Sequence, residues 1–280
     1  MKKQKLKKVG FSNAVLVLIF IAGLGLLLYP TVSNWWNQNY ASAIISSYDK
    51  EMDSKTKEEL EEQFARAQEY NKKLWDLYFP FEDFQSIPGY EDILGGEDGL
   101  GVLGYIQIDK INVNLPILQG TSEKVLSFAV GHLEGSSLPT GEENTHAVLS
   151  AHRGLPSAKL FTDLDRLREK DIFSVTILNK KFYYQVDQIR IVEPTDVRPL
   201  YLEKGKAYCT LLTCTPYGVN SERLLIRGHA IPEPPGEVVS EAIELDSLIL
   251  APILFVLLVV VLLWGLWYLD QKKKSRLNRQ

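Results

Sequence analysis

The chain combines long uninterrupted hydrophobic runs near both ends with short alternating runs between them. Residues 9–30 and 248–269 contain no charged side chain. About 20 consecutive apolar residues are enough to cross the hydrocarbon core of a bilayer as a helix. Runs of this length and purity are unusual for the core helices of globular domains. The pattern therefore predicts two transmembrane helices, at 9–30 and 248–269, on either side of a globular region.

Residues 31–100, between the first apolar run and the short alternating runs, divide into a helical part and an irregular part. Apolar residues recur at helical spacing among charged positions within residues 45–75: Leu60, Phe64, Ala67 and Leu74. This spacing predicts an amphipathic helix. Residues 76–101 instead combine prolines, glycines and clustered aromatics, which is typical of a loop with a few anchored side chains.

Short runs rich in β-branched and aromatic residues follow, with turn signals between them. They lie at residues 102–108, 113–119, 145–151, 172–178, 182–192, 207–213 and 223–230. A helix is expected near residues 157–169 and a hairpin turn at 179–181. Seven or eight short strands with one or two short helices predict a closed β-barrel over residues 101–235, followed by a linker at 236–247.

The charge distribution agrees with this division. The formal net charge is −4, but residues 1–8 and 270–280 are basic tails that carry five basic residues each. The remainder holds 21 basic and 34 acidic residues, a net charge of −13. The positive-inside rule places both tails in the cytoplasm and the acidic middle outside the cell. An acidic globular region also argues against general nucleic-acid binding.

The first apolar run has a second interpretation. A basic start, an apolar stretch and the sequence Ala41-Ser42-Ala43 also resemble a secretory signal with its cleavage site. Cleavage would leave a mature chain that starts at Ile44 and keeps only the second anchor. The apolar stretch is long for a signal, so a retained membrane anchor is the favoured interpretation. Both interpretations export the globular region.

The two cysteines lie too far apart to pair. Along an extended strand the Cα atoms of Cys209 and Cys214 are roughly 16 Å apart, at about 3.3 Å per residue. A disulfide needs less than about 7 Å, and an odd separation places the two side chains on opposite faces. Cys209, inside the strand, is expected to be a small core residue. Cys214 stands where the strand ends and a turn begins, a rigid and accessible position that suits a nucleophile.

A nucleophilic thiol needs a base or a cation beside it. His152 follows a predicted strand and begins a loop, so its position matches that of Cys214. The other three histidines are placed in a loop or inside strands: His132, His146 and His229. The pattern favours His152 without excluding the others.

Arg223 begins the strand that follows Cys214, and a hairpin would bring the two together. A guanidinium fixed there could bind a substrate carbonyl and stabilise an oxyanion. A solvated strand end is the alternative interpretation. The histidine, cysteine and acidic residues show no metal-binding spacing, so neither a metal nor another cofactor is expected.

Two motifs resemble those of a known family, the sortases. The stretch TLLTCTPYGVNSERLLIRGHA at residues 210–230 is similar to their cysteine motif, with an arginine on the following strand. SAHRG at 150–154 is similar to the loop that carries their histidine. The order of elements from 101 to 232 also matches. The C-terminal apolar run and the long segment before the barrel resemble class C, the pilin polymerases of Gram-positive bacteria.

The resemblance implies a mainly β fold: a sortase-like barrel with a helical N-terminal extension and a lid loop, flanked by transmembrane helices. It implies that Cys214 is the nucleophile, His152 the acid and base, and Arg223 the clamp for substrate and transition state. Sortases cleave LPXTG-like sorting signals between Thr and Gly, hold the acyl group as a thioester and pass it to an amine. For class C the partners are pilin subunits, and the amine belongs to a pilin lysine.

Class C sortases usually carry a lid that plugs the active site through an Asp-Pro-aromatic anchor, and this chain has no Asp-Pro pair. The loop LYFPFEDF at residues 77–84 lies where that lid would be. The candidate plugs are Phe79, Phe81 and Phe84. The candidate partners for Arg223 are Asp76 and Asp83. A loop that only packs on the barrel is the alternative.

Two other functions remain possible for the same fold. One is a non-catalytic, membrane-tethered scaffold for surface-protein assembly, and the other is a thiol protease that uses water as acceptor. The sequence Leu138-Pro139-Thr140-Gly141 resembles a sorting signal but lacks its variable residue and lies within the barrel region. No such signal precedes the second apolar run. The chain is therefore expected to be the enzyme rather than a substrate.

Overall fold

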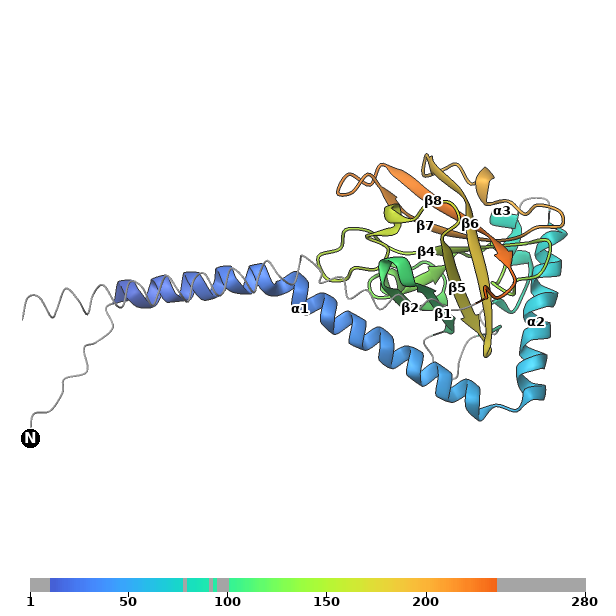
Figure 1. Ribbon diagram of the computed structural model, residues 1–280, viewed down its shortest axis with the longest axis horizontal. Coiled ribbons are helices and arrows are strands. Elements are labelled where there is room, and N and C mark those ends of the chain that lie inside the picture. Colours follow the sequence, from blue (N-terminus) through green and yellow to red (C-terminus); the bar gives the residue numbers. More distant parts are fainter. Residues whose placement is uncertain (1–10, 78–79, 91–92, 95–100, 236–280) are drawn as a thin grey trace, which may run out of the picture. The chain divides into compact units, whose positions relative to one another are not determined.

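The structure is a computed structural model that describes residues 11–77, 80–90, 93–94 and 101–235 (Figure 1). The chain divides into two compact units, one formed by Met1–Ser33 with Glu241–Gln280 and the other by Asn34–Ser240. In the first unit only residues 11–33 are described, as the beginning of helix α1 (Phe11–Ser54). The predicted linker, second transmembrane helix and basic tails lie outside the described residues.

Helix α1 has 44 residues and contains Pro30. It is the one helix, within the described part of the chain, that is long and apolar enough to cross a membrane. The prediction of a membrane-spanning helix near the N-terminus therefore agrees with the structure by length and composition.

The helix predicted over residues 45–75 is in fact two helices, the end of α1 and α2 (Lys57–Trp75). A capping box explains the break. The backbone N–H of Glu59 donates to the hydroxyl of Thr56 over 3.2 Å, and the backbone N–H of Thr56 donates to the Glu59 carboxylate over 2.7 Å. These two bonds satisfy donors at the start of α2 that would otherwise have no partner. Between α2 and residue 94, the described residues include α3 (Pro80–Asp83) and a 3-10 turn, η1 (Phe84–Ser86), and most of the others are turns and bends, as expected.

Eight strands close into a barrel in the order β1-β2-β3-β4-β7-β8-β6-β5 (Figure 1). They are β1 (Val102–Ile108), β2 (Val113–Gln119), β3 (Val130–His132), β4 (Thr145–Ser150), β5 (Ile172–Ile177), β6 (Lys180–Val192), β7 (Ala207–Thr215) and β8 (Glu222–Ile231). The short helical turns are η3 (Asp109–Ile111), α4 (Glu123–Leu126), η4 (Leu164–Arg166) and η5 (Arg198–Leu200). Parallel pairing joins β2 to β3 and β4 to β7. The predicted barrel of seven or eight strands is confirmed.

Two local predictions were wrong. Residues 157–169 form turns and the short η4 instead of a helix. Leu160 has a φ of +40°, and the Phe161 N–H donates to the carbonyl of His152. Neither feature is compatible with a helix. The apolar residues at helical spacing therefore belong to a loop that buries them. The β5–β6 hairpin turns at Leu178 and Asn179, one residue earlier than expected, and both have positive φ. Such φ values are characteristic of tight two-residue hairpin turns.

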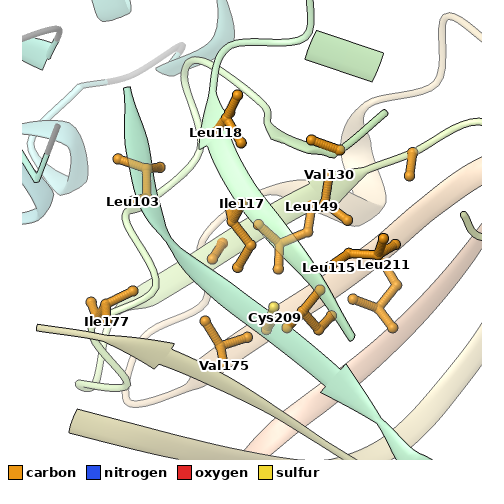
Figure 2. Close-up of a cluster of buried hydrophobic side chains, with 14 of the residues drawn as sticks. Leu103, Leu115, Ile117, Leu118, Val130, Leu149, Val175, Ile177, Cys209 and Leu211 are labelled. Carbon is orange, nitrogen blue, oxygen red and sulfur yellow. The ribbon is translucent and has the colours of Figure 1, made fainter. Parts of the chain in front are cut away.

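The inner face of the barrel holds the main core (Figure 2). Side chains from neighbouring strands meet there, including Ile117, Leu149, Val175 and Leu211. Cys209 lies among them and is fully buried. Burial raises the pKa of its thiol far above the ordinary range. The prediction that Cys209 is an inert core residue agrees with this environment.

The helical extension is bonded to the barrel at buried positions. The Tyr48 hydroxyl of α1 donates to the Leu103 carbonyl over 3.0 Å and accepts from the Leu178 N–H over 2.8 Å. In α2, the Asn71 amide donates to the carbonyl of Leu138 over 3.0 Å and accepts from the Leu138 N–H over 2.8 Å. These contacts fix the extension, and therefore the start of the segment that follows α2, against the barrel.

Candidate active site

Cys214 occupies the outer face of the barrel near the end of β7. Side chains alternate along a strand, so the burial of Cys209 and Leu211 in the core places Cys214 on the opposite face. Cys214 is half-buried, and both cysteines are free thiols. The predictions that the two cysteines do not pair and that Cys214 is the accessible one agree with the structure.

The pairing of β7 with β8 places Arg223 directly opposite Cys214. Directly opposed residues of an antiparallel pair lie on the same face, with Cβ atoms about 4.5–5.5 Å apart. On the other side of β7, the parallel pairing with β4 ends at Ser150 opposite Leu212. His152 lies two residues further along, level with Cys214.

Beyond the end of β4, hydrogen bonds join the following residue to β7. The Ala151 N–H donates to the Leu212 carbonyl over 3.2 Å, and the Thr213 hydroxyl donates to the Ala151 carbonyl over 2.8 Å. Cys214 therefore stands at the end of a strand whose two neighbours bring His152 from one side and Arg223 from the other.

The loop that begins at His152 is fixed by its own contacts. The Arg153 guanidinium bonds to the Asp165 carboxylate and lies over the ring of Tyr217, at 5.8 Å from the ring centroid. Gly154 has a φ of +76°, and a Cβ atom there would come within 3.0 Å of the same ring. Tyr217 belongs to the β7–β8 loop, just after Cys214. The loops that follow β4 and β7 are therefore packed against each other beside the thiol.

His152 and Arg223 are only partly bonded. The His152 Nε2 atom is buried, lies 3.4 Å from a carboxylate oxygen of Glu123, and forms no hydrogen bond within the described residues. The Arg223 guanidinium donates only through Nη1, to the carbonyls of Asn220 at 3.2 Å and Glu222 at 3.0 Å, among the residues that the structure describes. Both side chains therefore retain hydrogen-bonding capacity for a substrate.

The buried positions of His132 and His146 exclude them as the base for Cys214. Burial lowers the pKa of each imidazole to about 4. His132 ends β3 instead of lying in a loop, and its ring nitrogens bond to the Tyr90 hydroxyl and the Ser137 carbonyl. Both rings are neutral, fully bonded parts of the fold.

An apolar patch lies on the outer face of the barrel next to Cys214. A second buried cluster is formed by Val148, Leu200 and Leu225. Leu212, which precedes Cys214 on the same face of β7, packs against this cluster together with Phe81 of α3. The Phe81 ring also stacks on Tyr201, with centroids 5.9 Å apart. We refer to the cluster of Val148, Leu200 and Leu225 with Leu212 as the apolar patch.

The other predicted lid residues have different positions. Phe84 packs against the main core of the barrel instead of the apolar patch. Phe79 lies outside the described residues. Asp76, which caps the end of α2, and Asp83 are both exposed. Neither forms an ion pair with Arg223 among the described side chains, so the structure brings Phe81 to the outer face but not these two carboxylates to Arg223.

Glu123, the neighbour of His152, was not predicted from the sequence. The short α4 helix that carries Glu123 lies between β2 and β3, and no motif marks it. The pairing of β3 with both β2 and β4 brings this connection close to the end of β4. No group of three or more metal-ligating side chains occurs within the residues that the structure describes.

Comparison with known proteins gives the family. A model of the sortase domain matches residues 106–231. Sortase C1 from Streptococcus agalactiae is 47% identical, with coverage of 69% of this chain and 100% of its own and a TM-score of 0.63. Sortase C from Streptococcus pneumoniae, whose structure is described with its pilin substrate specificity, is 42% identical, with coverage of 70% and 100% and a TM-score of 0.62. Sortase C from Clostridium perfringens, solved with the C-terminal cell wall sorting motif, is 43% identical, with coverage of 69% and 100% and a TM-score of 0.60. The chain belongs to the sortase family of cysteine transpeptidases, and its structural neighbours are class C enzymes.

Proposed function

We propose that this sortase cleaves LPXTG-like sorting signals between Thr and Gly and transfers the acyl group to a lysine amine of a pilin subunit. The observation that carries the proposal is the arrangement at the end of β7. Cys214 faces Arg223 on β8, and His152 follows the end of the parallel neighbour β4. A thiol, a base and a fixed cation at three adjacent strand ends are the groups that acyl transfer through a thioester requires.

In the first half of the reaction, the Cys214 thiolate attacks the Thr carbonyl carbon of the sorting signal. A bond forms between sulfur and carbon, and the carbonyl electrons move to the oxygen. Arg223, opposite Cys214, stabilises this oxyanion through its free N–H groups. The C–N bond then breaks, and the protonated imidazole of His152 gives its proton to the leaving Gly amine. The product is a thioester on Cys214 and a neutral His152.

In the second half, neutral His152 takes a proton from the ammonium group of the incoming lysine, which leaves the free amine. The amine nitrogen attacks the thioester carbon, and the C–S bond breaks with its electrons on sulfur. The new amide loses its remaining extra proton to water. Cys214 returns to the thiolate and His152 to the imidazolium, so the enzyme is ready for another sorting signal. Neither half needs a cofactor.

Two relatives support the choice of substrate. The pneumococcal sortase C is described with pilin substrates, and the C. perfringens enzyme with a cell wall sorting motif. Each is more than 40% identical to this chain and covered over its full length. We infer the same substrate class for this chain.

We also infer that Phe81 covers the apolar patch when no substrate is bound. Its ring packs on the same buried cluster as Leu212, two residues before the nucleophile. An apolar side chain of a substrate would need the same surface. We infer that Phe81 takes the place of the Asp-Pro-aromatic anchor that the sequence lacks; among the described residues, no carboxylate pairs with Arg223.

We propose that the enzyme is anchored in the membrane with its barrel outside the cell and both termini in the cytoplasm. The length and apolar character of the N-terminal helix support one anchor. The uncharged run at 248–269 and the basic residues outside both runs support the second anchor and the orientation. A mature N-terminus at Ile44 would show that the first anchor is removed.

The test is a ligation assay with the detergent-solubilised full chain, an LPXTG-type peptide and a pilin subunit. The expected product is the peptide joined to a pilin lysine through an isopeptide bond, identified by mass spectrometry of tryptic fragments. Peptide hydrolysis alone would indicate a thiol protease. Binding of both partners without any cleavage would indicate a scaffold.

A further inference from the structure

An exposed carboxylate lies beside the candidate base. The Glu123 Oε2 atom is 3.4 Å from Nε2 of His152, and the Glu123 side chain is 84% exposed whereas that of His152 is 27% exposed. Glu123 begins α4 at the rim of the site, outside the three strands that carry Cys214 and its neighbours. It is therefore a group that a ligand from solution meets before it reaches His152.

The geometry argues against a role for Glu123 in holding the imidazole. A charge-assisted hydrogen bond between nitrogen and carboxylate is about 2.7–2.9 Å long. The observed 3.4 Å is longer, and Nε2 forms no hydrogen bond within the described residues. A carboxylate this exposed is well solvated and interacts weakly with its neighbour. Glu123 consequently retains acceptor positions for another cation.

The other charged side chains near Glu123 do not occupy the acceptor positions of its carboxylate. The next residue, Lys124, is exposed, and adjacent residues on a helical turn do not face each other. The Arg153 guanidinium is engaged by Asp165 and Tyr217. Among the described side chains, Glu123 forms an ion pair only with His152.

The acceptor lysine is a cation of the kind that the Glu123 carboxylate can bind. A lysine side chain has a pKa of about 10.4, so it arrives as an ammonium ion and must lose a proton before it can attack. Arg223 places a positive charge on one side of Cys214 and repels an ammonium from that direction. The opposite side, where His152 and Glu123 lie, is the electrostatically favourable approach.

We propose that Glu123 binds the ammonium group of the acceptor lysine and presents it to His152. This inference rests on the proposed transfer reaction and names the residue that binds its second substrate. The ammonium first pairs with the carboxylate, then gives one proton to the neutral imidazole of His152. The free amine forms the C–N bond with the thioester carbon, the electrons of the broken C–S bond stay on Cys214, and the new amide nitrogen loses its extra proton to water.

The test compares two nucleophiles on the full chain and on Glu123→Gln, which keeps the shape of the side chain and removes its charge. The first is Nα-acetyl-lysine amide, which is cationic, and the second is hydroxylamine, which is largely uncharged at neutral pH. We expect the KM for the lysine compound to rise about two- to fivefold, the range for an exposed ion pair. The rate of thioester formation and the reaction with hydroxylamine should not change.

Two further variants sharpen the result. Glu62→Gln removes one exposed charge from α2 and should leave the KM for the lysine compound unchanged. Glu123→Asp keeps the charge and should recover most of the loss. Higher ionic strength should raise the KM of the unaltered chain more than that of Glu123→Gln, because salt screens exposed charges.

Three outcomes would overturn the inference. An unchanged KM for the lysine compound, with normal thioester formation, would exclude amine binding by Glu123 while leaving the proposed function intact. An equal loss of the transfer rate with both nucleophiles, together with slower thioester formation, would assign Glu123 to positioning His152 instead. Absence of any thioester on the unaltered chain would overturn the proposed function and this inference with it.

Discussion

A histidine and an arginine lie near each of the two ends of the outer face formed by β4, β7 and β8, and the two pairs differ in how completely they are bonded. At one end, His152 and Arg223 flank Cys214. At the other, His146 and Arg227 flank Tyr208 and Thr210. The same three strands therefore hold similar residue types in two environments.

At the far end the Arg227 and His146 side chains are both bonded, whereas Nδ1 of His229, opposite Tyr208, forms no hydrogen bond among the described residues. The Arg227 guanidinium binds both oxygens of Asp187 at 3.0 and 3.1 Å, and its carbon lies 4.0 Å from the ring centroid of Tyr208. The ring of His146 is held by the Tyr201 carbonyl at 3.0 Å and the Thr210 hydroxyl at 2.7 Å. At the Cys214 end, His152 Nε2 has no hydrogen bond within the described residues. The difference shows that residue type alone does not mark a reactive site, because reactive groups must keep bonding capacity for a substrate.

The largest expected effect concerns the two arginines. Arg223→Ala should lower the rate of thioester formation about 10²- to 10³-fold, the usual cost of losing an oxyanion donor, and should change the free energy of unfolding by less than about 0.5 kcal/mol. Arg223→Lys keeps the charge but not the planar fork, and should give an intermediate rate. Stopped-flow or quench-flow rates with a sorting peptide provide the measurement. A normal rate of thioester formation for Arg223→Ala would contradict the claim that the arginine beside Cys214 is catalytic.

The buried histidines predict a loss of stability in acid. Burial lowers the pKa of His132 and His146 to about 4, against about 6.5 in an unfolded chain. Below pH 6.5 the unfolded state binds protons that the folded state does not, so stability falls as the pH decreases towards 4. The loss should reach about 3 kcal/mol for each histidine.

Urea unfolding between pH 7 and pH 4.5 measures this slope. His146→Gln should flatten it, whereas Cys214→Ala should leave it unchanged. Identical slopes for His146→Gln and the unaltered chain would show that His146 does not titrate as its buried position requires.

Arg227→Met should affect stability instead of chemistry. The Arg227 side chain is only 14% exposed, and its removal leaves the Asp187 carboxylate without its bidentate partner. We expect a loss of about 2 kcal/mol in the free energy of unfolding and a normal rate of thioester formation per folded molecule. A rate loss comparable to that of Arg223→Ala would place Arg227 in the catalytic machinery.

The smallest expected effect concerns Phe81 and Phe84. Phe81→Ala should increase the rate at which a thiol reagent modifies Cys214 by roughly tenfold, because about 1.5 kcal/mol of apolar contact with the apolar patch is lost. Phe84→Ala is the matched control, since Phe84 packs on the main core, and should leave labelling unchanged. Equal labelling of both variants and the unaltered chain would exclude Phe81 as a plug.

The strands and the central residues of the site could be predicted from the sequence because each depends on a local signal. Alternating apolar residues located seven strands, and the end of one strand distinguished Cys214 from Cys209. β3 was not predicted, because three residues, Val130–His132, carry too little pattern and are defined only by pairing with β2 and β4. The helix expected at 157–169 was wrong because burial against the barrel imposes the same apolar spacing on a loop.

Contacts between distant segments could not be predicted. Nothing in the sequence distinguishes Phe81 from Phe79 or Phe84, since the distinction depends on how α3 packs against the apolar patch. Glu123 is separated from His152 along the chain and approaches it only because β3 pairs with both β2 and β4. The proposed acceptor site was therefore accessible only from the three-dimensional structure.

The most direct test of the account is the mass of the full chain after incubation with an LPXTG-type peptide in the absence of an amine. The account predicts an adduct equal to the peptide up to its Thr, located on Cys214 by peptide mapping, released by hydroxylamine and absent from Cys214→Ala. Cys209→Ala should still form it, because Cys209 is buried in the barrel core. No adduct on the unaltered chain, or an adduct that survives Cys214→Ala, would contradict the central claim that Cys214 is the nucleophile.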